Sequence, residues 1–205
     1  MKLAHTLKQL EGVAKLEVRD ANVNLPNLLT VGRILLIPVF VLLFSVPSPA
    51  RSMAAAVVFV IAAVTDLLDG YLARRRGQVT KLGHLLDPIA DKLLVLSGLI
   101  LLVQYHRVAA PIAILIIARE VAVTGVRAIA ASEGLVLSAE ATGKYKMTVQ
   151  VIAIVLLILG DSLAPVFSNL AVLGTILLYA ALALGLYSGG RYLAAFWRQV
   201  ATKVL

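Results

Sequence analysis

Four aspartates, Asp66, Asp69, Asp87 and Asp91, lie close together in this chain of 205 residues. Asp66 and Asp69 are three residues apart and Asp87 and Asp91 are four apart, so each pair would share one face of a helix. Facing carboxylates repel one another unless cations neutralise them, and a cluster of oxygen donors is what Mg²⁺ or Mn²⁺ prefers. The spacing therefore predicts a site for two divalent ions, which suits in-line displacement at phosphorus.

A purely structural role is the alternative for some of these acids. Asp87 would serve as a helix N-cap, with Pro88 at the first helical position, where proline is tolerated. Asp69 would pair with Arg74 or Arg75. Capping explains neither of the other two aspartates, so we expect the four to act together.

The composition indicates the surroundings in which these acids must work. The chain is 60% hydrophobic and only 15% charged, which is far from the composition of a soluble domain. It has no cysteine, so thiol catalysis and cysteine-ligated metals are excluded. The formal net charge of +8 favours anionic lipid head groups over nucleic acid as the partner. We therefore expect a polytopic membrane protein that binds no nucleic acid.

Long apolar segments predict the elements that position the site. A membrane-spanning helix needs about 20 mainly apolar residues, and no alternating pattern suggests a barrel. The expected fold is all-α, with six transmembrane helices around a polar cavity that opens to the cytosol. The expected spans are approximately Asn27–Phe44, Ser52–Arg74, Asp87–Tyr105, Ala109–Ala130, Lys146–Leu159 and Pro165–Phe196, of which the fifth must borrow a turn from Gly143–Tyr145.

The distribution of lysine and arginine predicts the orientation in the membrane. Most of these residues lie in the segments that the six spans place on one side, which the positive-inside rule assigns to the cytosol. Both termini would then face the cytosol in the cell (inner) membrane. We divide the chain into residues 1–23, an amphipathic helix on the membrane surface, and residues 24–205, the transmembrane domain.

The acidic region resembles a known signature. Residues 66–91 read DLLDGYLARRRGQVTKLGHLLDPIAD, which fits the pattern D-x₂-D-G-x₂-A-R-x₈-G-x₃-D-x₃-D of the CDP-alcohol phosphotransferases without a mismatch. The segments NLPNLLTVGRILLIP, AREVAVTGVR and GKYK are similar to the subgroup that makes phosphatidylglycerophosphate. Met147 departs from that subgroup, which usually has threonine there, and Thr148 follows it.

This resemblance implies a reaction and a set of functional residues. The enzyme would join CDP-diacylglycerol and sn-glycerol 3-phosphate, and the members of the family are usually homodimers. The metal ligands would be Asp66, Asp69 and Asp87, with Asp91 as a further ligand or as the catalytic base. Residues expected to contact CDP-diacylglycerol are Asn27, Thr30, Arg33, Asp69, Gly70, Ala73, Arg74 and Gly83.

Basic residues within the later helices are candidates for binding the acceptor's phosphate. They are Arg119, Arg127, Lys144 and Lys146. Glu120 and Arg127 fall on one helical face, so we expect Glu120 to orient Arg127. The alternative is that Arg119 and Arg127 form internal ion pairs that serve packing, and that Lys144 and Lys146 are lysines at a helix end that face lipid. Gly185 and Gly189 form a small-xxx-small pair that would serve either a dimer or packing within the chain.

Three other functions fit part of the pattern. The signature is shared by enzymes with other acceptors, among which a cardiolipin synthase using phosphatidylglycerol and an enzyme using inositol phosphate are the nearest rivals. Intramembrane acids also line divalent-cation transporters. Transporters usually repeat such sites in two halves near the midplane, whereas here all four acids lie in one helical hairpin.

Overall fold

The computed structural model describes residues 25–46, 48–76, 81–133, 141–160, 162–163 and 166–204. Side chains are described throughout these ranges except at residues 25–27, 67–76, 81–88, 141–144 and 201–204. The expected surface helix of residues 1–23 lies outside the described residues. Within the described ranges the chain forms α-helices and no strand, as the composition predicts.

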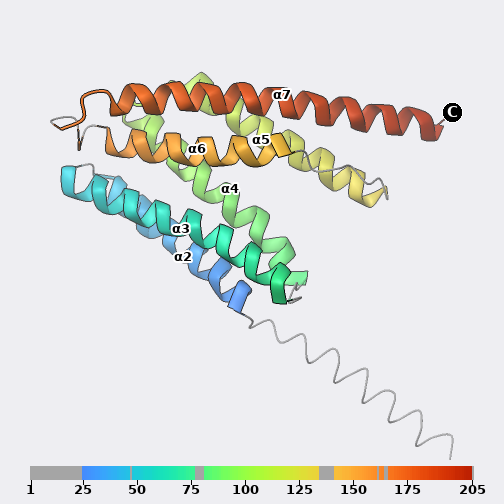
Figure 1. Cartoon of the computed structure of the whole chain (residues 1–205), viewed down its shortest axis with the longest axis horizontal. Helices are drawn as coiled ribbons and strands as arrows, with labels where there is room; N and C mark the ends of the chain where they lie inside the picture. Colours follow the sequence, from blue (N-terminus) through green and yellow to red (C-terminus); the bar gives the residue numbers. More distant parts are fainter. Residues whose placement is uncertain are drawn as a thin grey trace, which may run out of the picture.

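Six helices follow one another in the described part of the chain (Figure 1). Their bounds are α2 (Leu25–Phe44), α3 (Pro49–Arg76), α4 (Lys81–Gln104), α5 (Ala110–Ser132), α6 (Ala141–Leu159) and α7 (Leu170–Val204). Pro38 lies inside α2, and the first turn of α5 contains a proline, where its missing N–H costs nothing. α6 begins at Ala141, so this helix has the extra turn that its short apolar run required.

Two helix boundaries differ from the sequence prediction in ways that matter. α4 begins at Lys81, so Asp87 lies inside this helix, and the N-cap role for Asp87 is wrong. α7 begins at Leu170 rather than Pro165 and runs on to Val204. Its 35 residues span roughly 52 Å, which exceeds the hydrocarbon core of a bilayer, about 30 Å.

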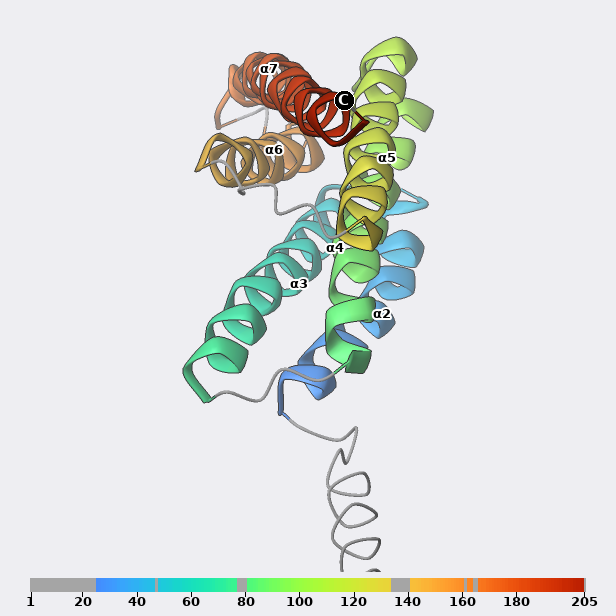
Figure 2. The ribbon, with the colours of Figure 1, turned by 90° about the vertical axis from the view of Figure 1, so that its right-hand side faces the viewer.

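The helices pack in neighbouring pairs. α6 lies along α7, α2 lies along α3, and α5 packs against α7 (Figures 1 and 2). Helices α3, α4 and α6 meet at Gly98, where a Cβ atom would lie 3.1 Å from both Ile154 and Phe59. Only glycine allows α4 to approach the other two helices so closely.

Aromatic side chains fill the end of the bundle where α2 joins α3. The rings of Phe40 and Phe59 are 5.3 Å apart and meet edge to face, and Phe44 contacts Tyr105 in the same way. The guanidinium of Arg107 lies over Phe44 and donates hydrogen bonds to the carbonyls of Leu157 and Ile158, at 3.0 and 2.8 Å. Arg107 thereby satisfies carbonyl groups at the C-terminal end of α6, which lack partners within the helix.

The outer face of the bundle is apolar. Leu35, Leu42 and Ile114 expose 60% or more of their surface, and comparable exposed side chains occur on every helix. By length and hydropathy, the segments Pro49–Asp66 and Leu170–Val200 are long enough to cross a membrane, and Leu28–Phe44 and Tyr145–Leu159 are shorter apolar helices. Exposed apolar surface of this extent is expected of a protein that lies in lipid.

Candidate active site

An ion pair joins α2 to α3 at the end of the bundle opposite the aromatic cluster. Nη1 of Arg33 lies 2.7 Å from Oδ1 of Asp66, and the Arg33 side chain is fully buried. Thr30, one turn before Arg33 on the same face of α2, is also fully buried. A buried arginine requires an anionic partner, so Arg33 fixes the position of the Asp66 carboxylate.

The carboxylate of Asp91, on α4, lies in the same charged region. It is within Coulombic range of four other side chains, Asp66, Arg33, Glu120 and Lys146. These side chains come from α2, α3, α5 and α6, so five helices contribute charges to one place. Asp66 and Asp91, on the hairpin of α3 and α4, thus lie within electrostatic range of each other.

Helix geometry explains why these charges lie at the same depth. The contact of Gly98 with Phe59 and Ile154 fixes one level of the bundle. About two helical turns from this level, roughly 10–12 Å along each axis, the same faces carry Asp66 on α3, Asp91 on α4 and Lys146 on α6. The apolar contact at Gly98 therefore determines that the charged residues of the three helices lie at the same level.

Several predicted residues lie in helices whose side chains are outside the described part of the chain. They are Asn27 in α2, Asp69, Gly70, Ala73 and Arg74 in α3, Gly83 and Asp87 in α4, and Lys144 in α6. Among the described side chains, no group of three histidine, cysteine or acidic residues surrounds a metal site. The four-aspartate cluster accordingly remains a prediction, of which Asp66 and Asp91 are the described half. Carboxylate oxygens on facing helices are the donors that a hard divalent cation requires.

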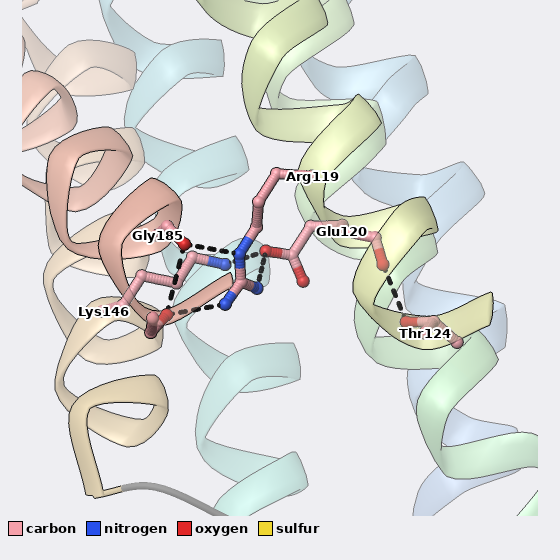
Figure 3. A network of polar contacts seen from close by, with 6 residues as sticks. Arg119, Glu120, Thr124, Lys146 and Gly185 are labelled. Carbon is pink, nitrogen blue, oxygen red and sulfur yellow. Dashed lines mark hydrogen bonds and ion pairs between the residues drawn. The ribbon is translucent and has the colours of Figure 1, made fainter. Parts of the chain in front are cut away.

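Glu120 and Lys146 also belong to a network of polar contacts that joins α5, α6 and α7 (Figure 3). The guanidinium of Arg119 donates hydrogen bonds to the carbonyl oxygen of Gly185 at 2.9 Å, to Oγ of Ser188 at 2.8 Å and to Oε1 of Glu120 at 2.9 Å. The ammonium of Lys146 pairs with the same Glu120 oxygen. One carboxylate thus bridges two cations, and the three side chains carry a net charge of +1.

This network corrects the expected role of Glu120. Its carboxylate pairs with Arg119 and Lys146, whereas Arg127 lies over the ring of Tyr192, 5.7 Å from the ring centroid. Arg127 is about two turns nearer the end of α5 than Glu120 and is exposed, so it lies apart from the pairs that Glu120 makes. Internal pairing was the alternative expected for Arg119, whereas the pairing of Glu120 with Lys146 was missed, although opposite charges within two apolar helices are candidates for pairing.

Gly185 and Gly189 face α5 within the same chain. A Cβ atom at Gly189 would lie 3.3 Å from Cγ2 of Val123 and 3.4 Å from Nε of Arg119, and one at Gly185 would lie 3.6 Å from the same nitrogen. The two glycines therefore let the Arg119 side chain lie flat between α5 and α7. Of the two roles expected for this pair, the structure supports packing within the chain.

An apolar helical bundle that gathers carboxylates and cations at one end is suited to an enzyme that acts on phosphorylated lipid substrates. Comparison with known proteins identifies the class. The model of the CDP-alcohol phosphatidyltransferase family matches residues 23–187, and the chain belongs to this family. The match includes Arg33, all four aspartates and the Arg119–Glu120–Lys146 cluster.

Curated relatives share most of their length with this chain. A protein of Bacillus subtilis strain 168 is 38% identical over 195 residues, which cover 87% of this chain and 98% of the relative. A protein of Pseudomonas fluorescens is 43% identical, with 87% and 93% covered, and one of Escherichia coli K12 is 38% identical, with 84% and 94% covered. All three are named CDP-diacylglycerol–glycerol-3-phosphate 3-phosphatidyltransferase.

Proposed function

We propose that this protein transfers the phosphatidyl group of CDP-diacylglycerol to sn-glycerol 3-phosphate, giving phosphatidylglycerophosphate and CMP. The carrying observation is that cations and carboxylates from five helices meet at one end of an apolar bundle. The names of the curated relatives support this acceptor over inositol phosphate or phosphatidylglycerol.

Asp66, Asp69, Asp87 and Asp91 would hold two divalent ions, Mg²⁺ or Mn²⁺, and the family is generally dependent on a divalent metal. When bound, such ions neutralise the pyrophosphate of CDP-diacylglycerol and make CMP a better leaving group. The oxygen-only donor set of the described aspartates fits this group of metals. Activity that survives exhaustive chelation, and that Mg²⁺ or Mn²⁺ does not change, would contradict the assignment.

The transfer itself is a substitution at phosphorus. The oxygen of the primary hydroxyl of glycerol 3-phosphate bonds to the phosphorus attached to diacylglycerol, and the bond between this phosphorus and the CMP oxygen breaks. Asp91 would accept the proton of the attacking hydroxyl as a general base. Asp91 suits this role because the charges of Arg33, Asp66, Glu120 and Lys146 all act on its carboxylate.

The remaining predicted residues divide between the two substrates. Arg119 and Lys146, with Arg127 and Lys144, would bind the phosphate of the acceptor, and Glu120 would hold the first two at a fixed separation. A second set near the acids would contact CDP-diacylglycerol: Asn27, Thr30, Arg33, Asp69, Gly70, Ala73, Arg74 and Gly83.

The arrangement in the membrane completes the proposal. All six helices would cross the inner membrane and enclose a polar cavity open to the cytosol, where both termini would lie. Residues 1–23 would form a helix on the inner membrane surface, residues 24–205 would form the catalytic domain, and two copies would form a homodimer. The clustering of charges at one end of the bundle supports this orientation.

An acceptor panel tests the proposed reaction. Purified protein receives CDP-diacylglycerol with radiolabelled glycerol 3-phosphate, inositol phosphate, serine or phosphatidylglycerol, and both labelled lipid and released CMP are measured. We expect glycerol 3-phosphate alone to enter lipid at a substantial rate. Preferential incorporation of any other acceptor would overturn the proposal.

A further inference from the structure

Gln150, on α6, is a buried polar residue that the proposed reaction leaves without a role. Its side chain is 2% exposed, and within the described part of the chain neither its amide oxygen nor its amide nitrogen has a hydrogen-bond partner. A primary amide carries two donors and one acceptor, and buried amides in native proteins are normally hydrogen-bonded. A bound molecule is therefore the candidate hydrogen-bond partner of the Gln150 amide.

The position of Gln150 relates it to the charged residues. Lys146, Gln150 and Ile154 follow one another at four-residue intervals and form one buried stripe along α6. Ile154 contacts the level of Gly98 and Phe59, whereas Lys146 pairs with Glu120. Gln150 therefore lies roughly 6 Å along the helix from each of them, between the charged residues and the apolar core.

Helices α3 and α4 offer this amide no side-chain partner at the same level. One turn from Gly98 and from Phe59 toward the charges, α4 carries Leu94 and α3 carries Ala62, both buried. Neither side chain has a hydrogen-bonding group. Among the described side chains of α3, α4 and α6, the amide is thus a polar group in the apolar layer next to the charged residues.

We propose that the amide of Gln150 binds the secondary hydroxyl of sn-glycerol 3-phosphate, the hydroxyl that does not react. This inference rests on the proposed function. If the phosphate binds Arg119 and Lys146 and the primary hydroxyl binds Asp91, the secondary hydroxyl on the middle carbon is the remaining polar group of the acceptor, and Gln150, one turn from Lys146, is the amide available to bind it. A hydroxyl can donate a hydrogen bond to the amide oxygen and accept one from the amide nitrogen.

Gln150 would then determine which acceptors the enzyme uses. A site built to hydrogen-bond a substrate hydroxyl discriminates strongly against analogues that lack it, because the buried protein group is left unpaired. The informative analogue is 3-hydroxypropyl phosphate, which retains the phosphate and the primary hydroxyl and lacks only the secondary one. We expect the wild-type enzyme to use it with a kcat/KM lower by roughly 10- to 100-fold.

The test compares the two acceptors across three variants of the full-length protein. Gln150→Met has nearly the same shape but no amide, and Gln150→Asn keeps an amide that is one carbon shorter. Ile154→Met is the matched control, because it changes the same stripe one turn deeper among apolar side chains. Gel-filtration profile and thermal unfolding of each purified variant report on folding.

The expected result is specific to one acceptor. Gln150→Met should lower kcat/KM for glycerol 3-phosphate, mainly through KM, to about the value for 3-hydroxypropyl phosphate, while KM for CDP-diacylglycerol is unchanged. Ile154→Met should keep the wild-type discrimination. Equal use of both acceptors by the wild type, or an equal loss on both acceptors in folded Gln150→Met, would overturn the inference.

Two further outcomes keep the inference separate from the proposed function. If Gln150→Met does not fold, Gln150→Asn decides, since full discrimination with the shortened amide contradicts a direct hydrogen bond. If the wild-type protein does not use glycerol 3-phosphate at all, the proposed function fails. If it does and Gln150→Met still discriminates, only the role of Gln150 fails.

Discussion

Asp66 is held in place by Arg33, a residue on another helix. The 2.7 Å contact between Nη1 and Oδ1 leaves the carboxylate little freedom to rotate, because the guanidinium is itself fully buried. Positioning of acidic groups by fixed partners reduces the reorganisation that a reaction requires. At the scale of single residues, the site is built from charges that restrain one another.

Replacement of Asp91 by asparagine tests the proposed base. We expect Asp91→Asn to lower turnover by about 10²- to 10⁴-fold, because the amide does not accept the proton of the attacking hydroxyl. The measurement is CMP release at saturating substrate, with CDP-diacylglycerol binding followed in parallel. Near-wild-type turnover with metal and substrate binding intact would exclude Asp91 as the base.

Glu120 is expected to contribute to stability. Glu120→Gln leaves Arg119 and Lys146 as neighbouring cations without their shared carboxylate, at a cost of about 1–3 kcal/mol. We expect a lower midpoint of thermal unfolding in detergent. The control is Glu133→Gln, the same change at an exposed position after α5, where solvent weakens charge interactions and we expect a much smaller shift. An equal shift in both variants would show that the Glu120 pairs contribute nothing specific.

At the scale of elements, the approach of α7 to α5 determines the geometry around Arg119. Gly185 supplies the carbonyl oxygen that accepts from Nε, Ser188 accepts from the guanidinium, and Gly189 leaves the space beside it. The long helix α7 is thus a wall of the charged cluster as well as an apolar segment.

Two adjacent glycines provide a matched test of this packing. A Cβ at Gly189 would lie 3.3 Å from Val123, whereas at Gly190 nothing lies within 4 Å among the described residues. Gly189→Leu should therefore push α7 away from α5 and lower activity at least about tenfold, and Gly190→Leu should leave it nearly unchanged. Phosphatidylglycerophosphate formation and thermal unfolding are measured for both. A similar loss in both variants would contradict the close contact.

The sequence predicted the helices and the family but only part of the site. The apolar runs and the spacing of the four aspartates are properties of neighbouring residues in the sequence, so both could be recognised without the structure. The partners of Glu120 depend on how α5, α6 and α7 pack. The sequence prediction paired Glu120 with Arg127 because the two share one helical face, and this prediction was wrong. The start of α4 at Lys81 was missed because the six residues before Asp87 include polar and small side chains that resemble a loop.

At the scale of the whole molecule, the apolar outer surface and the polar end have opposite requirements. Exposed leucine, isoleucine and valine side chains cover the outside of the helices, whereas the described buried charges lie inside, toward one end. This distribution favours a bundle in lipid whose charged end meets the aqueous phase from which glycerol 3-phosphate comes.

Single cysteines test the orientation, since the chain has none of its own. Ser48 and Ser168 are exposed beyond one end of the bundle and Glu133 beyond the other. We expect a membrane-impermeant maleimide to label Ser48→Cys and Ser168→Cys in intact cells, and Glu133→Cys only after permeabilisation. The reverse pattern would place the charged end outside the cytosol.

The ion pairs have a consequence for the synthesis of the protein. Arg33 and Asp66 lie on consecutive helices, as do Glu120 and Lys146. Each of these charges therefore meets its partner as soon as the next helix has left the ribosome, and the two helices can enter the bilayer as a hairpin with the pair already neutralised. Inserting a helix with an unpaired charge into the bilayer would cost about 2.5–3.5 kcal/mol of free energy. The ion pairs that position the charged residues of the site thus also allow the translocon to insert these helices two at a time.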